Sequence, residues 1–361
     1  MSSESQSIAD ISAAAESVGQ SKSAVRRSML WLQAIALLLG IGLLIYVIYI
    51  NGFQTLLEIT SRVGWGFLLL VSLNGARHFL RALCIYLAVP PRHRAFKFRF
   101  ALAARLGGEA VNVITFTGPF LGEATKAALL KKNLPLVHGG AAVVVDNILY
   151  YTSVIIMILS GVGIMSFAYS NGKTMTYALE GVAAFSVLSF IGLILLVWFR
   201  VKPVGFTIRR LAKRNIAPKF LHKRLASINR LETNVYEFYI HRRGTFYALL
   251  GINFLAHALS VGEVYAALAM LGFPSGLTVS FIIESLTKVI NFAFSFVPGA
   301  VGVYEGGNGV ILHALGYATA TGVALALVRR GAIIFWTSVG LAILLWRAVT
   351  HGARRLAAEE D

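Results

Sequence analysis

Two interrupted apolar stretches of this sequence carry residue types that could bind a charged group inside a membrane. The first, NVITFTGPFLGEATKAALL (112–130), contains a Gly-Pro pair followed by a Gly-Glu step. The second, NFAFSFVPGAVGVYEGG (291–307), contains a Pro-Gly pair and then a carboxylate. Non-helical backbone at membrane depth is tolerated only where protein or a water-filled cavity satisfies its polar groups. Both stretches are therefore expected to line a polar site.

The Gly118–Pro119 pair predicts the end of one half-helix, because proline lacks an N–H and clashes with the preceding turn. A second half-helix beginning near Leu121 would present free N–H groups and a positive dipole, which suit a phosphate. Glu123 stands at that end, where it could accept those N–H groups or meet a cationic headgroup. Pro298–Gly299 and Glu305 predict a related break. The alternative is a pair of ordinary kinks between full spans, each glutamate being a helix cap.

Charged side chains also stand inside complete apolar runs. Arg77 and Arg81 are four residues apart and share a helix face, and two guanidinium groups suit a phosphodiester. Alternatively, they extend to the interface or pair with Glu109 or Glu123. Asp146 lies near the start of a span, either as a functional charge or simply in the interface.

Two further pairs of opposite charge are four residues apart: Arg105 with Glu109, and Glu284 with Lys288. This spacing favours local ion pairs that hold the broken helices together. His257 is interpreted as structural. The residues expected to contact a substrate are Arg77, Arg81, Asn112, Gly118, Pro119, Gly122, Glu123, Lys126, Asp146, Asn291, Pro298, Gly299 and Glu305.

The elements that would position these residues are membrane-spanning helices. Apolar residues make up 57% of the chain and charged residues 14%, whereas a soluble domain carries about 25% charged residues. An all-α polytopic membrane protein is therefore predicted, with a disordered tail over 1–28 and one transmembrane domain over 29–348. The predicted full spans are 29–50, 65–88, 139–168, 176–199, 245–270 and 331–348. The two interrupted regions are 100–131 and 278–318.

Lysine and arginine predict the orientation. The segment 200–244 contains twelve Lys or Arg residues against two Glu, and 90–105 is also basic, whereas 51–64, 169–175 and 271–277 are poor in basic residues. Basic connections face the cytoplasm. Both termini, including the 349–361 tail, are then cytoplasmic in an inner (cytoplasmic) membrane. Each interrupted region must return to the side that it entered from, as a re-entrant hairpin.

The basic 200–244 segment also has a helical apolar pattern. Its apolar residues recur at three- and four-residue steps: Leu221, Leu225, Ile228, Leu231, Val235 and Phe238. This predicts an amphipathic helix on the inner membrane surface, its apolar face toward the lipid. It would either gather anionic lipid or only anchor the topology.

An internal repeat relates the two interrupted stretches. A shift of 179 residues carries Asn112 onto Asn291 and Pro119 onto Pro298, and it carries the segment 65–168 onto 244–347. The repeats, about 65–168 and 245–348, begin on opposite sides of the predicted membrane and are therefore inverted. Inverted repeats with broken helices recur in transporters, with the binding site between them.

Together these stretches resemble a known family. NVITFTGPFLGEATKAALL followed by AAVVVDNILYY, and then FVPGAVGVYEG, are similar to the motifs of the lysylphosphatidylglycerol synthase/flippase transmembrane family. The resemblance covers about 65–348 and implies translocation of lipids or lipid-linked groups between leaflets. Members that also aminoacylate lipids carry a soluble synthase domain. The longest hydrophilic segment here is 200–244, so the resemblance implies the membrane part alone.

The expected function is therefore that of a lipid translocator with an anionic or zwitterionic phospholipid as substrate, and not that of an enzyme. The sequence contains no P-loop, no cofactor motif and no metal-ligand spacing, and its basic charge lies on the predicted membrane side, which argues against nucleic acid. Two alternatives are a membrane enzyme acting on a lipid-linked substrate and a membrane partner of a separate lipid synthase. The pattern does not predict an oligomeric state.

Overall fold

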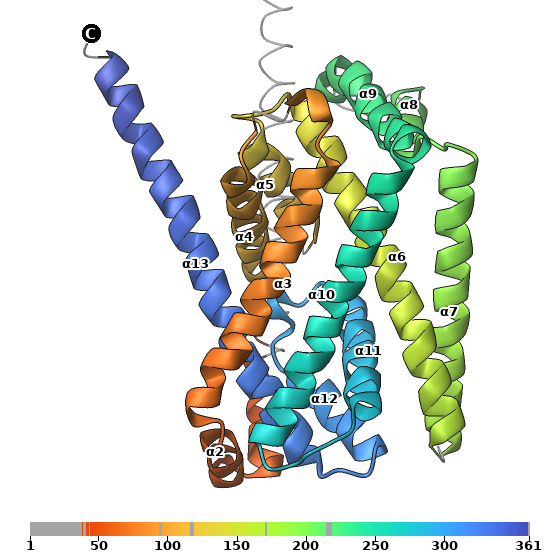
Figure 1. Ribbon diagram of the computed structural model, residues 1–361, viewed down its shortest axis with the longest axis vertical. Helices are drawn as coiled ribbons and strands as arrows, with labels where there is room; N and C mark the ends of the chain where they lie inside the picture. The colour runs from red at the N-terminus through yellow and green to blue at the C-terminus, as the bar shows by residue number, and fades with distance from the viewer. Residues whose placement is uncertain are drawn as a thin grey trace, which may run out of the picture.

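The protein is a bundle of helices, several of which are long enough to cross a bilayer (Figure 1). A computed structural model describes residues 38, 41–42, 44–93, 96–115, 119–169, 172–213 and 219–359, and this part of the chain contains no strand. The all-α polytopic architecture is thereby confirmed. Within the described residues, five helices have the length and composition of membrane spans: Gly64–Ala88, Leu136–Ala168, Lys173–Trp198, Arg243–Met270 and Thr319–Thr350.

Most predicted spans match helices of the structure to within a few residues. The described part of the 29–50 span is helical, and the remainder and the 1–28 tail lie outside the described residues. The helices in chain order are α2 (Phe53–Ser61), α3 (Phe67–Ala88), α4 (Phe98–Ile114), α5 (Pro119–Leu130), α6 (Leu136–Ala168), α7 (Lys173–Trp198), α8 (Pro203–Lys213), α9 (Lys219–His241), α10 (Arg243–Met270), α11 (Leu277–Ala293), α12 (Val303–Ala314) and α13 (Thr319–Glu359). Short 3-10 turns are η1 (Gly64–Gly66), η2 (Pro91–His93) and η3 (Pro298–Ala300).

The order of long and short helices occurs twice. A long helix, two short helices and a long helix form the unit α3–α4–α5–α6, and the same order returns in α10–α11–α12–α13. In Figure 1, α3 and α10 run side by side in opposite directions. The hairpin α4–α5 lies in the half of the bundle that carries α8 and α9, and the hairpin α11–α12 lies in the other half. Each interrupted stretch is thus a hairpin of two short helices.

The last span is longer than the sequence predicts. Its expected start was residue 331, but α13 begins at Thr319 and continues to Glu359, through most of the segment interpreted as a tail. Arg329 and Arg330 interrupt the apolar run, and the predicted span therefore begins directly after them. Both arginines are paired with carboxylates inside the bundle, so the helix continues through them.

The surface helix of the basic segment faces protein rather than lipid. Val235 and Phe238 of α9 are buried in an apolar cluster with residues of α6 and α10. Leu231 lies so close to Gly140 of α6 that a Cβ on that glycine would be 2.8 Å from its Cδ1 atom. The prediction of an apolar face turned toward lipid is therefore wrong for these residues. The side chain of Leu221 lies outside the described part.

Two apolar clusters enclose a polar layer in the middle of the bundle. One contains Leu70 near the start of α3 and Leu268 near the end of α10, and the other contains Ile85 near the end of α3 and Leu249 near the start of α10. The charged residues of α3 lie between them. The bundle therefore holds its polar groups at mid-length, where a membrane is most apolar.

Candidate functional site

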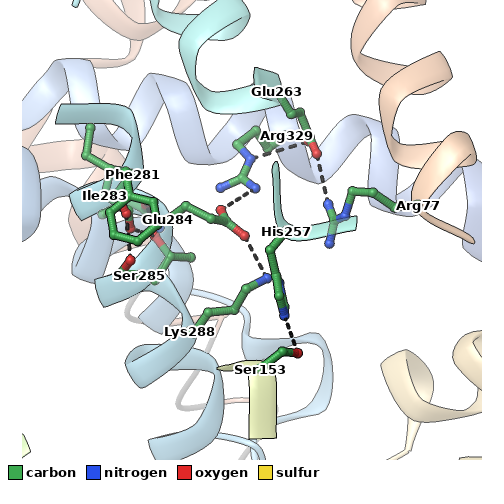
Figure 2. Close-up of polar contacts among 12 residues, drawn as sticks. Arg77, Ser153, His257, Glu263, Phe281, Ile283, Glu284, Ser285, Lys288 and Arg329 are labelled. Carbon is green, nitrogen blue, oxygen red and sulfur yellow. Dashed lines mark hydrogen bonds and ion pairs between the residues drawn. The ribbon is translucent and has the colours of Figure 1, made fainter. Parts of the chain in front are cut away.

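Five charged side chains form a continuous series of ion pairs inside the bundle, and we call this series the central ion chain (Figure 2). Arg77 on α3 donates to Glu263 on α10 at 2.9 Å, and Glu263 also accepts from Arg329 on α13 at 3.3 Å. Arg329 donates to Glu284 on α11 at 2.7 Å, and Glu284 accepts from Lys288 at 2.6 Å. The chain therefore links four helices from both four-helix units.

The central ion chain is buried except at one end. The side chains of Glu263 and Glu284 are each 1% exposed and that of Arg329 is 5% exposed, whereas Arg77 is 25% exposed. Charges at membrane depth are costly unless they are paired. The pairing satisfies this requirement. The partly exposed Arg77 is the point at which a molecule outside the bundle can reach the central ion chain.

The two arginines predicted to act together on α3 have different surroundings. Arg81 donates to Asp146 of α6 at 2.7 Å, and its guanidinium lies 3.9 Å from the centre of the Tyr150 ring. Arg81 and Asp146 are buried. Neither arginine pairs with Glu109 or Glu123, the alternative partners expected from the sequence, because Arg77 pairs with Glu263 and Arg81 with Asp146. Arg77 is therefore the accessible arginine of the pair, and Arg81 belongs to the packed core.

The first interrupted stretch forms a tight hairpin. Pro119 is the first residue of α5, a position where its missing N–H costs nothing, whereas Gly118 lies outside the described residues. A Cβ on Gly122 would be 1.8 Å from Oδ1 of Asn112 and 2.5 Å from the carbonyl oxygen of Gly108, so only glycine allows this approach of α4 and α5. Asn112 Oδ1 is buried without a hydrogen-bond partner among the described groups.

Local ion pairs lie within the short helices, and two of them are the pairs that the four-residue spacing predicted. Lys126 donates to Glu123 at 2.6 Å, and Arg105 lies 3.0 Å from Glu109. The expected pair of Glu284 with Lys288 belongs to the central ion chain. The local pairs are thus confirmed, and Glu284 gains a partner on α13 that spacing alone did not indicate.

The second interrupted stretch has a helix cap at its carboxylate. Gly299 has a φ of 61° and Gly302 a φ of 77°, which are left-handed values that favour glycine. Glu305 accepts from the N–H of Gly302 at 2.9 Å, which makes it the capping carboxylate of α12. Arg330 donates to Glu305 and also to the carbonyl oxygens of Gly299 (3.0 Å) and Ala300 (3.3 Å). The capping alternative for Glu305 is therefore correct.

The two breaks lie near each other although their residues are not equivalent in detail. The η3 turn packs on α4, and a Cβ on Gly299 would be 3.6 Å from the carbonyl oxygen of Val113. Asn291 is exposed, whereas Asn112, which the 179-residue shift aligns with it, is partly buried. Each break carboxylate has its own cation, Lys126 for Glu123 and Arg330 for Glu305. That Glu123 and Glu305 face one shared cavity stays a prediction.

Three residues of the site were missed by the sequence analysis: Glu263, Arg329 and Arg330. The arginine pair stands in the apolar run VALALVRRGAIIF, and two adjacent charges there are a signal of buried pairing. Glu263 stands alone in the α10 span, and only the fold brings it to Arg77 and Arg329. His257 is buried and contacts Ser153 at 2.9 Å, in agreement with a packing role.

Comparison with known protein families assigns most of the chain to one group. A family model described as the lysylphosphatidylglycerol synthase TM region matches residues 33–347. The matched range contains both hairpins and the whole central ion chain. No curated protein and no solved structure matches the chain.

Proposed function

Because the chain belongs to the lysylphosphatidylglycerol synthase transmembrane family, whose membrane domains have a lipid-related function, we propose that it translocates a phospholipid between leaflets. The observation that carries the proposal is the central ion chain. It places charged side chains at mid-length of the bundle, contributed by both four-helix units. A lipid headgroup crossing a bilayer needs such groups, because the hydrocarbon offers it no polar partner.

The proposed mechanism uses the opposite directions of the two units. If they are an inverted repeat, exchanging their conformations opens first one face of the bundle and then the other. Arg77 and the breaks at Pro119 and at Pro298–Gly299 would contact the headgroup. Arg81 and Asp146 would position α3 against α6. The acyl tails would stay in the bilayer, so only the headgroup needs the polar path.

The energy source in this proposal is the lipid gradient or a coupled ion, since the sequence contains no nucleotide-binding motif. The proposal places the protein in the inner (cytoplasmic) membrane, with membrane lipids as partners and both termini in the cytoplasm. It assigns the protein no enzymatic reaction.

Transport can be measured directly in liposomes. The purified protein is reconstituted into vesicles that contain a trace of fluorescent phospholipid, and dithionite then quenches the label in the outer leaflet only. We expect dithionite to quench more of the fluorescence than the outer-leaflet fraction, because the protein carries labelled lipid outward. In Arg77→Ala, this additional loss of fluorescence should be slower. The exposed Arg210 on α8 provides a matched control, because Arg210→Ala removes an arginine far from the ion chain.

Two results would contradict the proposal. Vesicles with the protein could show no more quenching than empty vesicles, although the protein is inserted and folded. Alternatively, mass spectrometry of the lipids could show a new covalent product, which would indicate the membrane enzyme instead.

A further inference from the structure

Among the ion pairs of the described residues, positive and negative charges balance everywhere except in the central ion chain. Outside the central ion chain, each pair joins one cation to one carboxylate: Arg81 with Asp146, Arg105 with Glu109, Lys126 with Glu123 and Arg330 with Glu305. The central ion chain itself contains Arg77, Arg329 and Lys288 against Glu263 and Glu284. Three cations face two carboxylates, so the central ion chain carries one positive charge in excess.

The excess charge is accompanied by an unused hydrogen-bond donor. Nη1 of Arg329 is buried and has no hydrogen-bond partner among the described residues, although the other two nitrogens of the guanidinium are paired. A buried charged donor without a partner is expensive, and its cost exceeds that of a neutral group. Figure 2 shows the guanidinium of Arg329 between the two carboxylates, with Arg77 on the other side of Glu263.

We propose that the central ion chain is a binding site for a monoanionic phosphodiester, so that the translocated lipid has a net negative charge. This inference rests on the proposed function and narrows its substrate class. One phosphodiester bound between Arg77 and Arg329 would give the central ion chain three positive and three negative charges. Its oxygens accept from the free Nη1 of Arg329 and from the partly exposed Arg77, since guanidinium groups bind phosphate well.

A zwitterionic headgroup fits the same site less well. Its phosphate would neutralise the excess charge, but its ammonium would bring one positive charge back to a region that already holds three cations. Like charges in a low-dielectric region repel strongly. The site therefore discriminates through net charge, in favour of phosphatidylglycerol and against phosphatidylethanolamine.

Binding in detergent tests the site without transport. The thermal stability of the purified protein is measured against increasing dioctanoyl-phosphatidylglycerol or dioctanoyl-phosphatidylethanolamine. Both lipids carry the phosphodiester, but the ammonium of phosphatidylethanolamine would be repelled by the three cations, and about 1.4 kcal/mol of repulsion corresponds to a tenfold difference in Kd. We expect phosphatidylglycerol to bind at least about tenfold more tightly. Equal stabilisation by both lipids would overturn the inference, as would equal stabilisation by inorganic phosphate, which would indicate a site for soluble anions.

Two variants remove the excess charge from opposite ends of the ion chain. Arg77→Gln leaves Glu263 paired with Arg329, and Lys288→Gln leaves Glu284 paired with Arg329. Both should retain their stability without lipid and lose the preference for phosphatidylglycerol. Arg105→Gln is the matched control, because it removes a cation from a balanced pair outside the chain and should keep the preference. A preference retained in both Arg77→Gln and Lys288→Gln would contradict the inference.

The transport assay separates this inference from the proposed function. Faster translocation of labelled phosphatidylglycerol than of phosphatidylethanolamine supports both. Equal rates for the two lipids leave the translocator proposal standing and overturn the charge selectivity. Selective binding of phosphatidylglycerol without any translocation supports the site and overturns the translocator proposal.

Discussion

Arg77 and Arg81 are one helical turn apart on α3, yet their surroundings assign them different roles. Among the described residues, Arg81 pairs with a single carboxylate, that of Asp146, and both side chains are buried. Arg77 is partly exposed, and its partner Glu263 has a second cation in Arg329. The consequences of removing each arginine should therefore differ. Removing Arg81 leaves Asp146 without a cation, whereas removing Arg77 leaves Glu263 paired with Arg329.

Arg81→Ala should destabilise the protein strongly. Removing one member of a buried ion pair costs about 3–5 kcal/mol, because the remaining charge is left buried and uncompensated. Arg77→Ala should cost no more than about 1 kcal/mol, as for a partly solvated pair. Thermal denaturation in detergent measures the difference. The double variant Arg81→Ala/Asp146→Ala should recover part of the loss, and equal melting temperatures for the two single variants would contradict this reading.

The break carboxylates should also differ in their response to neutralisation. Glu305 is fully buried, caps the Gly302 N–H and accepts from Arg330, whereas Glu123 is 22% exposed and accepts from Lys126. Glutamine keeps the shape of either side chain and removes its charge. We therefore expect Glu305→Gln to slow translocation more than Glu123→Gln, with membrane insertion retained in both. Unchanged translocation in the double variant would exclude these carboxylates from the transport path.

At the scale of the elements, each hairpin depends on glycine at one close approach. The α4–α5 pair meets at Gly122, where the Asn112 side chain and the Gly108 carbonyl occupy the space of a Cβ. In the α11–α12 connection, Gly299 and Gly302 supply left-handed backbone. The hairpins are therefore set by backbone geometry, while local ion pairs lie within α4, α5 and α11.

Gly122→Ala should open or distort the α4–α5 hairpin. Inserting a methyl group into a packed site typically costs about 1–3 kcal/mol and occasionally more. Gly251 in α10 is the matched control, because a Cβ there would meet nothing within 4 Å. Gly251→Ala should leave the melting temperature unchanged or raise it, since alanine is the better helix former. Equal melting temperatures for the two variants would refute the close packing of α4 on α5.

At the scale of the whole molecule, the two ends of the bundle differ in charge. Helices α8 and α9 of the basic segment lie at one end, and the α6–α7 and α10–α11 connections lie at the other (Figure 1). Because basic connections are retained in the cytoplasm, the end with α8 and α9 should face the cytoplasm. The C-terminal end of α13 lies on that same side in Figure 1.

Cysteine labelling tests this orientation. Cys84, the single cysteine, is buried and is replaced in the background variant Cys84→Ser. In intact cells, a membrane-impermeant maleimide should label Thr174→Cys and Pro274→Cys. It should label Arg210→Cys only after the membrane is permeabilised. Labelling of position 210 from outside intact cells would reverse the predicted topology.

The sequence by itself determined the features that depend on local pattern. Apolar runs of about 20 residues located the long helices, because a span needs that length. Proline and glycine located both breaks, since proline lacks the N–H of a helical hydrogen bond and glycine readily adopts left-handed backbone. Spacing of four residues found Arg105 with Glu109 and Glu284 with Lys288, which lie on one helix face and meet without help from the rest of the fold.

Only the tertiary structure decided which distant charges meet. Glu263 is 186 residues from Arg77 along the chain, and no local pattern connects them. In the same way, the pairing of Arg329 with Glu263 and Glu284, and of Arg330 with Glu305, makes both arginines acceptable inside a span, and α13 therefore begins at Thr319. The tertiary structure also decided what covers the apolar face of α9, which could have contacted either lipid or α6. A periodic pattern shows that a face is apolar, but what covers that face depends on packing between elements far apart in sequence.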